Sequence, residues 1–264
     1  MAAGGIRPVG LRCLVIGAAS GIGRAVVDRL APAAAALVAA DLPGAPRHGT
    51  DAGVAHVDLD VTDPASVEAG VAKALAQTGG RLDVVVNTAG IVGEVRPAAE
   101  ETLESFERTL RVNLTGAFLV SRAVLPHLAR SGSGRLIHFA STAGKEGVAG
   151  MAAYSASKAG IMGLTKALAK EYAASGVTVN AIAPGKIATP LIRDLTVTDA
   201  DLARIPLGRL GTAEEAAALV EYIASPRTPP TPPASSTTSP AAAPPTDPRD
   251  PPPDPAPHAQ GITP

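Results

Sequence analysis

Residues 12–23 read RCLVIGAASGIG, an apolar run followed by three glycines. The run from Arg12 to Ile16 predicts a buried strand, and residues 21–30 predict a helix. Gly17, Gly21 and Gly23 permit a tight turn and a close approach to the backbone, and the start of the helix offers N–H donors to an anion. We expect a dinucleotide pyrophosphate to bind here; a turn that only packs the helix on the strand is the alternative.

Short apolar runs continue to alternate with longer amphipathic ones along the chain. Further strands are predicted at 36–40, 54–59, 82–86, 135–139 and 177–182, and further helices at 64–76, 103–130, 152–174 and 213–224. The first of these helices would be capped by Thr62 or Asp63. This alternation predicts an α/β fold with a doubly wound, Rossmann-like parallel sheet in a single domain. Ligands of such sheets bind beyond the carboxyl ends of the strands.

The overall composition is that of a folded protein, with 46% hydrophobic and 18% charged residues. A formal net charge of −1 provides no basic surface for nucleic acid or for an anionic membrane. Because no apolar stretch reaches membrane-spanning length and we find no secretory signal, a cytoplasmic protein is expected. The single cysteine, Cys13, lies in an apolar run, which favours a buried and inert thiol.

Composition changes abruptly near the end of the chain. Of the 25 prolines, 15 lie between Pro226 and Pro264, among Ala, Ser, Thr and Asp. Such a segment cannot bury enough apolar surface to offset its ordering entropy. We therefore predict a folded domain at 1–225 and a disordered proline-rich tail at 226–264, whose PxxP-like runs leave a role in adaptor binding open.

A carboxylate ends the second predicted strand. Asp41 follows the glycine turn by about 20 residues, where a carboxylate accepts hydrogen bonds from the adenosine ribose hydroxyls. A carboxylate there also repels a 2′-phosphate, so the sequence predicts NAD rather than NADP as the cofactor. A plain strand-ending turn residue is the alternative.

Tyr154 and Lys158 form a second candidate pair. Residues four apart share one helix face, so the ammonium can approach the phenol oxygen. A nearby cation favours the phenolate and lowers the tyrosine pKa, which suits the group for proton transfer. An exposed helix turn without a catalytic role is the alternative.

Together with further motifs in the same order, these residues resemble the short-chain dehydrogenase/reductase family over Leu11 to about Ser225. The additional motifs are Asp60-Val61, Asn87-Thr-Ala-Gly90, Pro184-Gly185 with Ile187 and Thr189, and the segment 205–211. The resemblance implies a catalytic tetrad of Asn113, Ser141, Tyr154 and Lys158, and no metal. It also implies cofactor contacts from Gly17, Ser20, Gly21, Ile22, Gly23, Asp41, Asp60, Val61, Asn87, Ala89, Gly90, Tyr154, Lys158, Pro184, Gly185, Ile187 and Thr189.

The family resemblance also implies roles for the tetrad. Tyr154 would exchange a proton with the substrate oxygen, and Ser141 would hydrogen-bond that oxygen. Lys158 would lower the Tyr154 pKa and hold the nicotinamide ribose, while Asn113 would position a water. The expected function is hydride transfer between NAD(H) and a small-molecule secondary alcohol or ketone. A sugar acid or a 3-oxoacyl compound is the candidate substrate, because the stretch Lys145-Glu-Gly147 resembles stretches in relatives that act on such compounds. A solvated loop with no role in substrate binding is the alternative.

The sequence departs from the family at three places. Ile16 stands where the family has threonine, and Thr88 replaces a second asparagine. We hypothesise that the hydroxyl at this turn has moved from the first strand to its neighbour. After Ser225 the proline-rich segment stands where the family has a terminal seventh strand. We expect this strand to be missing, which would expose the edge of the sixth strand and the face under the last helix. A homodimer rather than the family's homotetramer is then expected.

Two other interpretations of the sequence stay open. One is a non-catalytic NAD-binding scaffold or sensor on the same fold. The other is an enzyme that is inactive because its C-terminal segment is altered, since reading a GC-rich gene out of frame would also produce an ending rich in Pro, Ala, Ser and Arg.

Overall fold

The computed structural model of this chain describes residues 10–47, 53–193, 198, 202–203 and 205–225. The first compact unit, Met1–Ala234, contains all the elements given below. The predicted tail at 226–264 lies outside the described residues, as does any strand within it. None of the described helices is long and apolar enough to cross a bilayer.

Six parallel strands form one sheet in the order β3-β2-β1-β4-β5-β6. Their bounds are β1 Arg12–Ile16, β2 Ala36–Asp41, β3 Val54–Asp58, β4 Val84–Asn87, β5 Arg135–Phe139 and β6 Thr178–Ile182. Because β1 pairs with both β2 and β4, the strand order reverses there and the topological switch point lies between β1 and β4. The predicted doubly wound α/β sheet is therefore confirmed.

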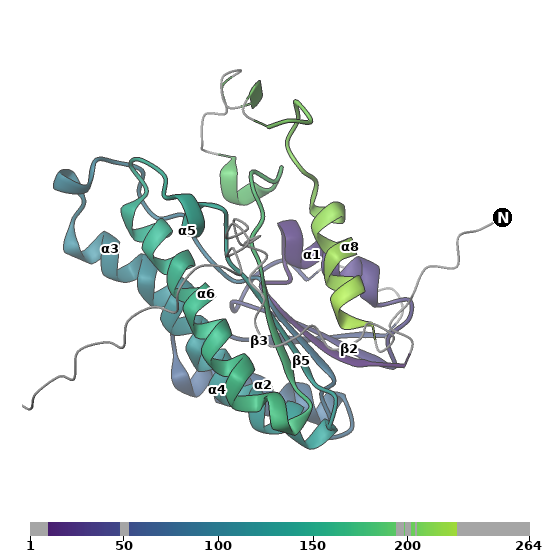
Figure 1. Cartoon of the computed structure of the whole chain (residues 1–264). Helices are drawn as coiled ribbons and strands as arrows, with labels where there is room; N and C mark the ends of the chain where they lie inside the picture. Colours follow the sequence, from purple (N-terminus) through teal and green to yellow (C-terminus); the bar gives the residue numbers. More distant parts are fainter. Residues whose placement is uncertain (1–9, 48–52, 194–197, 199–201, 204, 226–264) are drawn as a thin grey trace, which may run out of the picture. The chain divides into compact units, whose positions relative to one another are not determined.

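Helices cover both faces of the sheet (Figure 1). The longer helices are α1 Gly21–Leu30, α2 Pro64–Gln77, α4 Gly116–Ser131, α6 Ala152–Tyr172 and α8 Ala213–Ala224. Side chains alternate along β1, so that Val15 packs with α1 and α8 while Leu14 packs with α2, α4 and α6. The shorter elements are α3 Leu103–Leu110, α5 Ala143–Glu146 and the 3-10 turns Ala98–Glu100, Ala173–Ser175 and Pro190–Ile192.

The helix predicted at 103–130 is not uniform. It consists of α3, a π turn at Arg111–Thr115 and then α4, with no loop between them. A π turn holds one extra residue, which hydrophobic periodicity does not resolve. The helix α5 also escaped prediction because it is only one turn long. At the start of α2 the cap is Asp63, whose side chain accepts a hydrogen bond from the Ala65 N–H.

The last described helix is firmly docked. A capping box between Thr212 and Glu215 starts α8, and its inner residues Val220 and Ala224 are fully buried in the core that α8 shares with α1. We expected the face under this helix to be exposed; within the described residues it is packed. Among the described residues β6 pairs only with β5; the expected absence of a seventh strand concerns residues 226–264, which lie outside the described part of the chain.

Candidate active site

An open cleft of about 670 Å³ lies beyond the carboxyl ends of β1 and β4, where the strand order reverses. Its walls include the predicted residues Gly17, Ser20, Gly21, Ile22, Gly23, Asp41, Asp60, Val61, Ala89, Gly90 and Thr189. It is also lined by residues that were not predicted, among them Leu42, Thr62, Ile91, Arg108 and Arg111. Leu42 and Thr62 directly follow predicted residues. Arg108 and Arg111 stand three residues apart, shortly before Asn113. This position in the sequence was the signal that could have identified them as lining residues.

Glycines shape the turn between β1 and α1. Gly17 has φ +81°, in the left-handed region that favours glycine, and a Cβ on Gly23 would lie 2.0 Å from the Gly17 carbonyl oxygen. The N-cap residue Ser20 forms no side-chain capping bond in the described structure. The first N–H groups of α1 therefore have no partner within the helix, and they fit the phosphate oxygens of a dinucleotide.

A hydroxyl ties this turn to the next strand. Thr88 Oγ1 donates a hydrogen bond to the carbonyl oxygen of Ile16 at 2.8 Å, and it also lies 3.1 Å from the Gly17 oxygen. The Thr88 N–H bonds the Ile16 carbonyl as well, at 2.9 Å. The hypothesis that the hydroxyl has moved from the β1 position to the β4 position agrees with these bonds.

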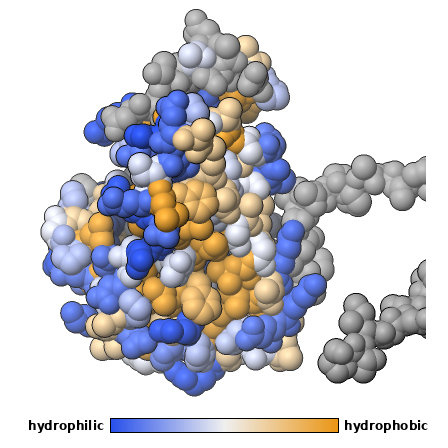
Figure 2. All heavy atoms as spheres, turned by 90° about the vertical axis from the view of Figure 1, so that its left-hand side faces the viewer, coloured by the Kyte–Doolittle hydropathy of each residue, from blue (hydrophilic) through white to orange (hydrophobic). Residues whose placement is uncertain are grey.

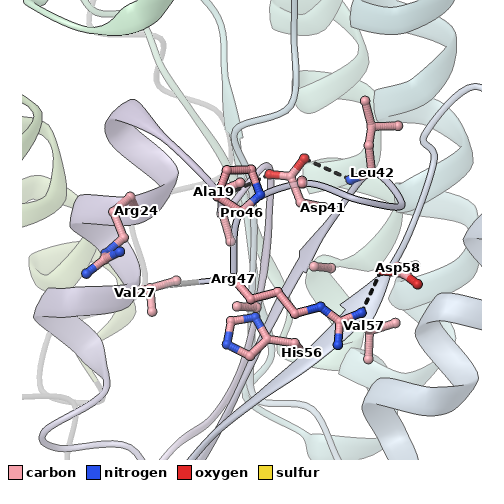
Figure 3. Close-up of a pocket in the computed structure, with 14 residues that line it drawn as sticks. Ala19, Arg24, Val27, Asp41, Leu42, Pro46, Arg47, His56, Val57 and Asp58 are labelled. Atoms are coloured by element: carbon pink, nitrogen blue, oxygen red, sulfur yellow. Dashed lines mark hydrogen bonds and ion pairs between the residues drawn. The ribbon is translucent and has the colours of Figure 1, made fainter. Parts of the chain in front are cut away.

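Asp41, at the end of β2, lines both the cleft and the smaller cavity that Figure 3 shows. Its carboxylate accepts hydrogen bonds from the Ala19 N–H at 2.7 Å and from the Leu42 N–H at 2.8 Å, so its position is fixed. Behind it lies a second cavity of only about 20 Å³, room for one water molecule. Arg47 lines that cavity but is paired with Asp58 at 3.0 Å.

Asp60 and Val61 hold the wall opposite the glycine turn. One carboxylate oxygen of Asp60 accepts hydrogen bonds from both the N–H and the hydroxyl of Thr62, each at 2.8 Å. Val61 is buried against Gly116 at the start of α4, where a Cβ would come within 2.9 Å of it. The loop after β3 is thus fixed to the helix layer.

Lys158 is the buried charge of the site. Only 4% of it is exposed, its Nζ donates to the Phe139 carbonyl at 2.8 Å, and burial lowers its pKa to about 8. A Cβ on Gly90 would lie 3.3 Å from this Nζ and 3.1 Å from Asn113 Oδ1. Gly90, which lines the cleft, therefore brings the cleft wall next to the Lys158 ammonium.

Tyr154 differs from the expectation based on its spacing. The Lys158 Nζ lies 5.6 Å from the centre of the tyrosine ring. Burial nevertheless raises the Tyr154 pKa, and the opposing influence is a hydrogen bond with Ser141 rather than the lysine. The expected lowering by Lys158 is wrong for this structure, because that ammonium bonds the Phe139 carbonyl instead. The phenol is held in its protonated form.

Asn113 connects the π turn to the catalytic helix. Its Nδ2 donates to Ser157 Oγ and to the Ile91 carbonyl, both at 2.9 Å, and its Oδ1 accepts from the Ile91 N–H at 2.8 Å. Ser157, one residue before Lys158, was not predicted; its place inside the Tyr154–Lys158 segment was the available signal. Asn113 therefore joins α6 to the loop that follows Gly90.

The remaining predicted residues are placed around this centre. Ser141, at the end of β5, is buried and accepts a hydrogen bond from the Ala143 N–H at 3.1 Å. The Pro184 carbonyl accepts from the Thr142 N–H at 2.9 Å, which joins the loop after β6 to the serine. The predicted contacts that do not line the cleft are Asn87, Tyr154, Lys158, Pro184, Gly185 and Ile187. Among the described residues, no group of His, Cys, Asp and Glu gathers that could hold a metal ion.

Comparison with known proteins adds independent findings. The sequence pattern of the family described as short chain dehydrogenase matches residues 12–200. A 2-dehydro-3-deoxy-L-rhamnonate dehydrogenase (NAD(+)) of Sphingomonas sp. (strain SKA58) is 42% identical over 220 residues, covering 81% of this chain and 88% of that protein. A 3-oxoacyl-[acyl-carrier-protein] reductase of Vibrio cholerae is 40% identical over 222 residues, covering 81% and 89%. The crystal structure of levodione reductase superposes with a TM-score of 0.74 at 33% identity, covering 84% and 92%.

Proposed function

The chain belongs to the short-chain dehydrogenase family and is an oxidoreductase; from that premise we propose that it transfers a hydride between NAD(H) and a secondary alcohol or ketone. The observation that carries the proposal is the buried Lys158 ammonium, which lies beside the Tyr154 ring and next to Gly90 on the cleft wall. A charge buried at a cost in stability, beside a protonated phenol and a dinucleotide-shaped cleft, fits proton transfer to a substrate oxygen.

The bound cofactor would supply or accept the hydride. The Tyr154 phenol would donate its proton to the ketone oxygen in reduction; in oxidation it would first lose that proton, and the phenolate would take the proton of the alcohol. Ser141 would donate a hydrogen bond to the same oxygen and stabilise its developing negative charge. Lys158, with a pKa of about 8, would bind the nicotinamide ribose and exchange protons near neutral pH. Asn113 would hold Ile91 and Ser157 in place around it.

The preference for NAD over NADP rests on Asp41. A 2′-phosphate at the rim would meet a carboxylate that two backbone N–H groups hold in place. The cavity behind it is small, at about 20 Å³, and the nearby Arg47 is paired with Asp58, so this cation is already engaged. Repulsion by Asp41 therefore favours the cofactor that carries a free ribose hydroxyl.

Titration of the purified full-length chain with NADH and, separately, NADPH tests this proposal, with the fluorescence of bound cofactor as the signal. We expect saturable NADH binding in the micromolar range and weaker NADPH binding. Equal affinities would overturn the NAD preference. No binding of either cofactor by a folded chain would overturn the proposed function and favour the inactive interpretation.

For the substrate we propose a carboxylated hydroxy compound such as a sugar acid. The support is the named activity of the Sphingomonas relative, together with the exposed Lys145 on α5, which follows Ser141 closely in sequence. A 3-oxoacyl thioester is the second candidate, supported by the Vibrio relative. Initial rates with a panel of sugar acids and 3-oxoacyl thioesters distinguish the two, and activity with neither class would remove both.

We also propose a homodimer formed through α4 and α6. Figure 2, which looks onto the side where these helices lie, shows hydrophobic residues gathered between hydrophilic ones. On α4, Phe118 is 47% exposed, and on α6 the small residues Ala156 and Ala159 are exposed. Sedimentation velocity should give a dimer for the parent chain and a monomer for Phe118→Glu. A monomeric parent chain would contradict the proposal.

A further inference from the structure

A fully buried histidine lies one strand away from the cofactor cleft and has no part in the reaction described above. His138, on β5, is 0% exposed and stands opposite Asn87 in the register between β4 and β5. Its Nε2 lies 2.9 Å from Ser121 Oγ on α4, and its Nδ1 lies 3.5 Å from Asn87 Nδ2. The imidazole therefore bridges the helix layer and the turn that lines the cleft.

The serine decides which ring nitrogen carries the proton. Ser121 Oγ donates its hydrogen to the Ala117 carbonyl at 2.7 Å, so toward His138 it can only accept. The Nε2 must then be the N–H donor. Burial, and next the charge of Lys158, lower the His138 pKa to about 4, so the ring is neutral near pH 7 and its Nδ1 has a free lone pair.

That lone pair in turn decides the orientation of Asn87. Within the Asn87 carboxamide, only the Nδ2 group can donate a hydrogen bond to the Nδ1 of His138. In this orientation the carboxamide oxygen of Asn87 faces the Ala89 N–H and accepts a hydrogen bond from it at 3.2 Å. The result is a chain of four hydrogen bonds that runs in one direction, from the Ala89 N–H to the Ala117 carbonyl on α4. Ala89 lines the cleft, whereas Asn87, His138 and Ser121 do not.

We propose that His138 is a positioning residue for the cofactor site: as a neutral imidazole protonated on Nε2, it orients the Asn87 carboxamide and so fixes the backbone of the turn at Ala89. The opposite tautomer would set an N–H of the ring against an N–H of Asn87. The amide would then have to turn over and would present a second donor to the Ala89 N–H. This inference rests on the proposed function, because Ala89 matters only if a cofactor occupies the cleft.

Three variants of the full-length chain test it. In His138→Asn, the shorter side chain can still place an acceptor oxygen near the position of Nδ1. His138→Leu removes the acceptor and keeps an apolar core residue. Ser121→Ala removes the hydroxyl at the far end of the chain of hydrogen bonds. Ser121 does not line the cleft. Three readouts apply: the NADH dissociation constant, hydrogen exchange of the Ala89 amide without cofactor, and the ¹⁵N spectrum of labelled histidine, which reports the tautomer.

In the parent chain we expect the Nε2–H tautomer and a protected Ala89 amide. His138→Leu should raise the NADH dissociation constant about five- to tenfold, the net loss of one hydrogen bond, and expose the Ala89 amide to exchange. At saturating cofactor kcat should change less than KM. Ser121→Ala should also raise the NADH dissociation constant and expose the Ala89 amide to exchange. The NADH dissociation constant of His138→Asn should stay within about twofold of that of the parent.

Other outcomes would overturn the proposal. The Nδ1–H tautomer in the parent chain would do so, as would equal weakening by His138→Leu and His138→Asn, which would indicate a core packing role alone. Melting temperatures identify any variant that is unfolded, and the tautomer is measured on the parent without any substitution. A parent chain that binds no NADH contradicts the proposed function instead, and the exchange and tautomer measurements still decide the hydrogen-bond chain.

Discussion

The two ends of the active-site region are built by different means. At the end where we propose that adenosine and phosphate bind, backbone N–H groups and glycines form the walls, and two main-chain hydrogen bonds hold Asp41. At the catalytic end, buried side chains hold one another: Asn113 bonds Ser157, and Lys158 bonds a strand carbonyl. The first end depends on the absence of side chains. The second depends on polar groups removed from water.

This difference predicts how each end responds to substitution. A backbone cradle has no ionisable group to lose, so it fails when a Cβ enters it. A buried polar cluster can contain a group whose charged form is disfavoured, so removing that one charge can raise the stability of the fold. Four substitutions test that contrast, taken from the largest expected effect to the smallest.

Tyr154→Phe should reduce turnover by about 10²- to 10⁴-fold, because the proton donor to the substrate oxygen is lost. Binding of NADH should stay within about twofold, since the phenol does not line the cleft. Steady-state rates and a cofactor titration measure the two quantities. Tyr222→Phe on the exposed side of α8 is the matched control and should behave as the parent. Unchanged turnover in Tyr154→Phe would favour the non-catalytic scaffold.

Gly23→Ala should abolish cofactor binding and destabilise the fold by roughly 2–4 kcal/mol, within the range for overpacked and strained sites. The new Cβ would lie 2.0 Å from the Gly17 carbonyl oxygen and 2.6 Å from Thr88 Oγ1. The control is Gly163→Ala on α6, made in the Phe118→Glu background so that the proposed dimer is absent, because a Cβ there meets nothing within 4 Å in the single chain. That change should stabilise the helix by about 0.5–1 kcal/mol. Denaturant unfolding of both variants measures the difference, and a stable, NADH-binding Gly23→Ala chain would contradict the cradle.

Lys158→Met should remove activity and stabilise the cofactor-free chain. The folded pKa of about 8 lies below the ordinary 10.5, so at pH 7 the buried charge costs on the order of 3 kcal/mol. The lost bond to the Phe139 carbonyl offsets about 1–2 kcal/mol of that, which leaves a net gain of about 1–2 kcal/mol.

The pH dependence gives the sign of this effect. Between pH 8 and 10.5 the unfolded chain binds a proton that the folded chain has released, so the parent gains stability as pH rises through that window. The advantage of Lys158→Met should therefore shrink there. Denaturant unfolding at pH 7 and pH 10 measures it; a variant less stable than the parent at pH 7 would show that the charge is well solvated.

Asp41→Asn should change the ratio of NADH to NADPH affinity by about tenfold in favour of NADPH, because it removes the charge that repels a 2′-phosphate. The small cavity beside Asp41 and the fixed position of this side chain limit the gain in NADPH affinity. Asp58→Asn removes a carboxylate from the same cavity without touching the cleft and should leave NADH affinity unchanged. Equal effects of the two variants would mean that only the overall charge of the region matters.

The contrast between the two ends also separates what sequence could predict from what it could not. Glycines and the strand-ending Asp41 have fixed spacing along the chain, so the glycine turn and the parallel, doubly wound sheet could be predicted from the sequence, although the order of the strands was not. The catalytic end depends on contacts between distant segments. The Tyr154–Lys158 spacing predicted proximity, but it gave no sign that the ammonium would bond the carbonyl of Phe139, 19 residues earlier. The bridging role of His138 depends on α4 and β4 together, and periodicity shows neither partner.

The π turn at Arg111–Thr115 has a consequence for how the chain tolerates changes in length. It contains one residue more than a regular helix needs. A one-residue deletion here would let α3 and α4 join as a single α-helix with both halves on the faces that they occupy now. The side chains within the former turn would shift about the helix axis by up to about 100°. Asn113 would swing away from Ser157 although every neighbouring residue type was kept. The structure of this segment therefore depends on its number of residues as well as on their types. Libraries of insertions and deletions would detect this constraint, which substitution scans do not sample.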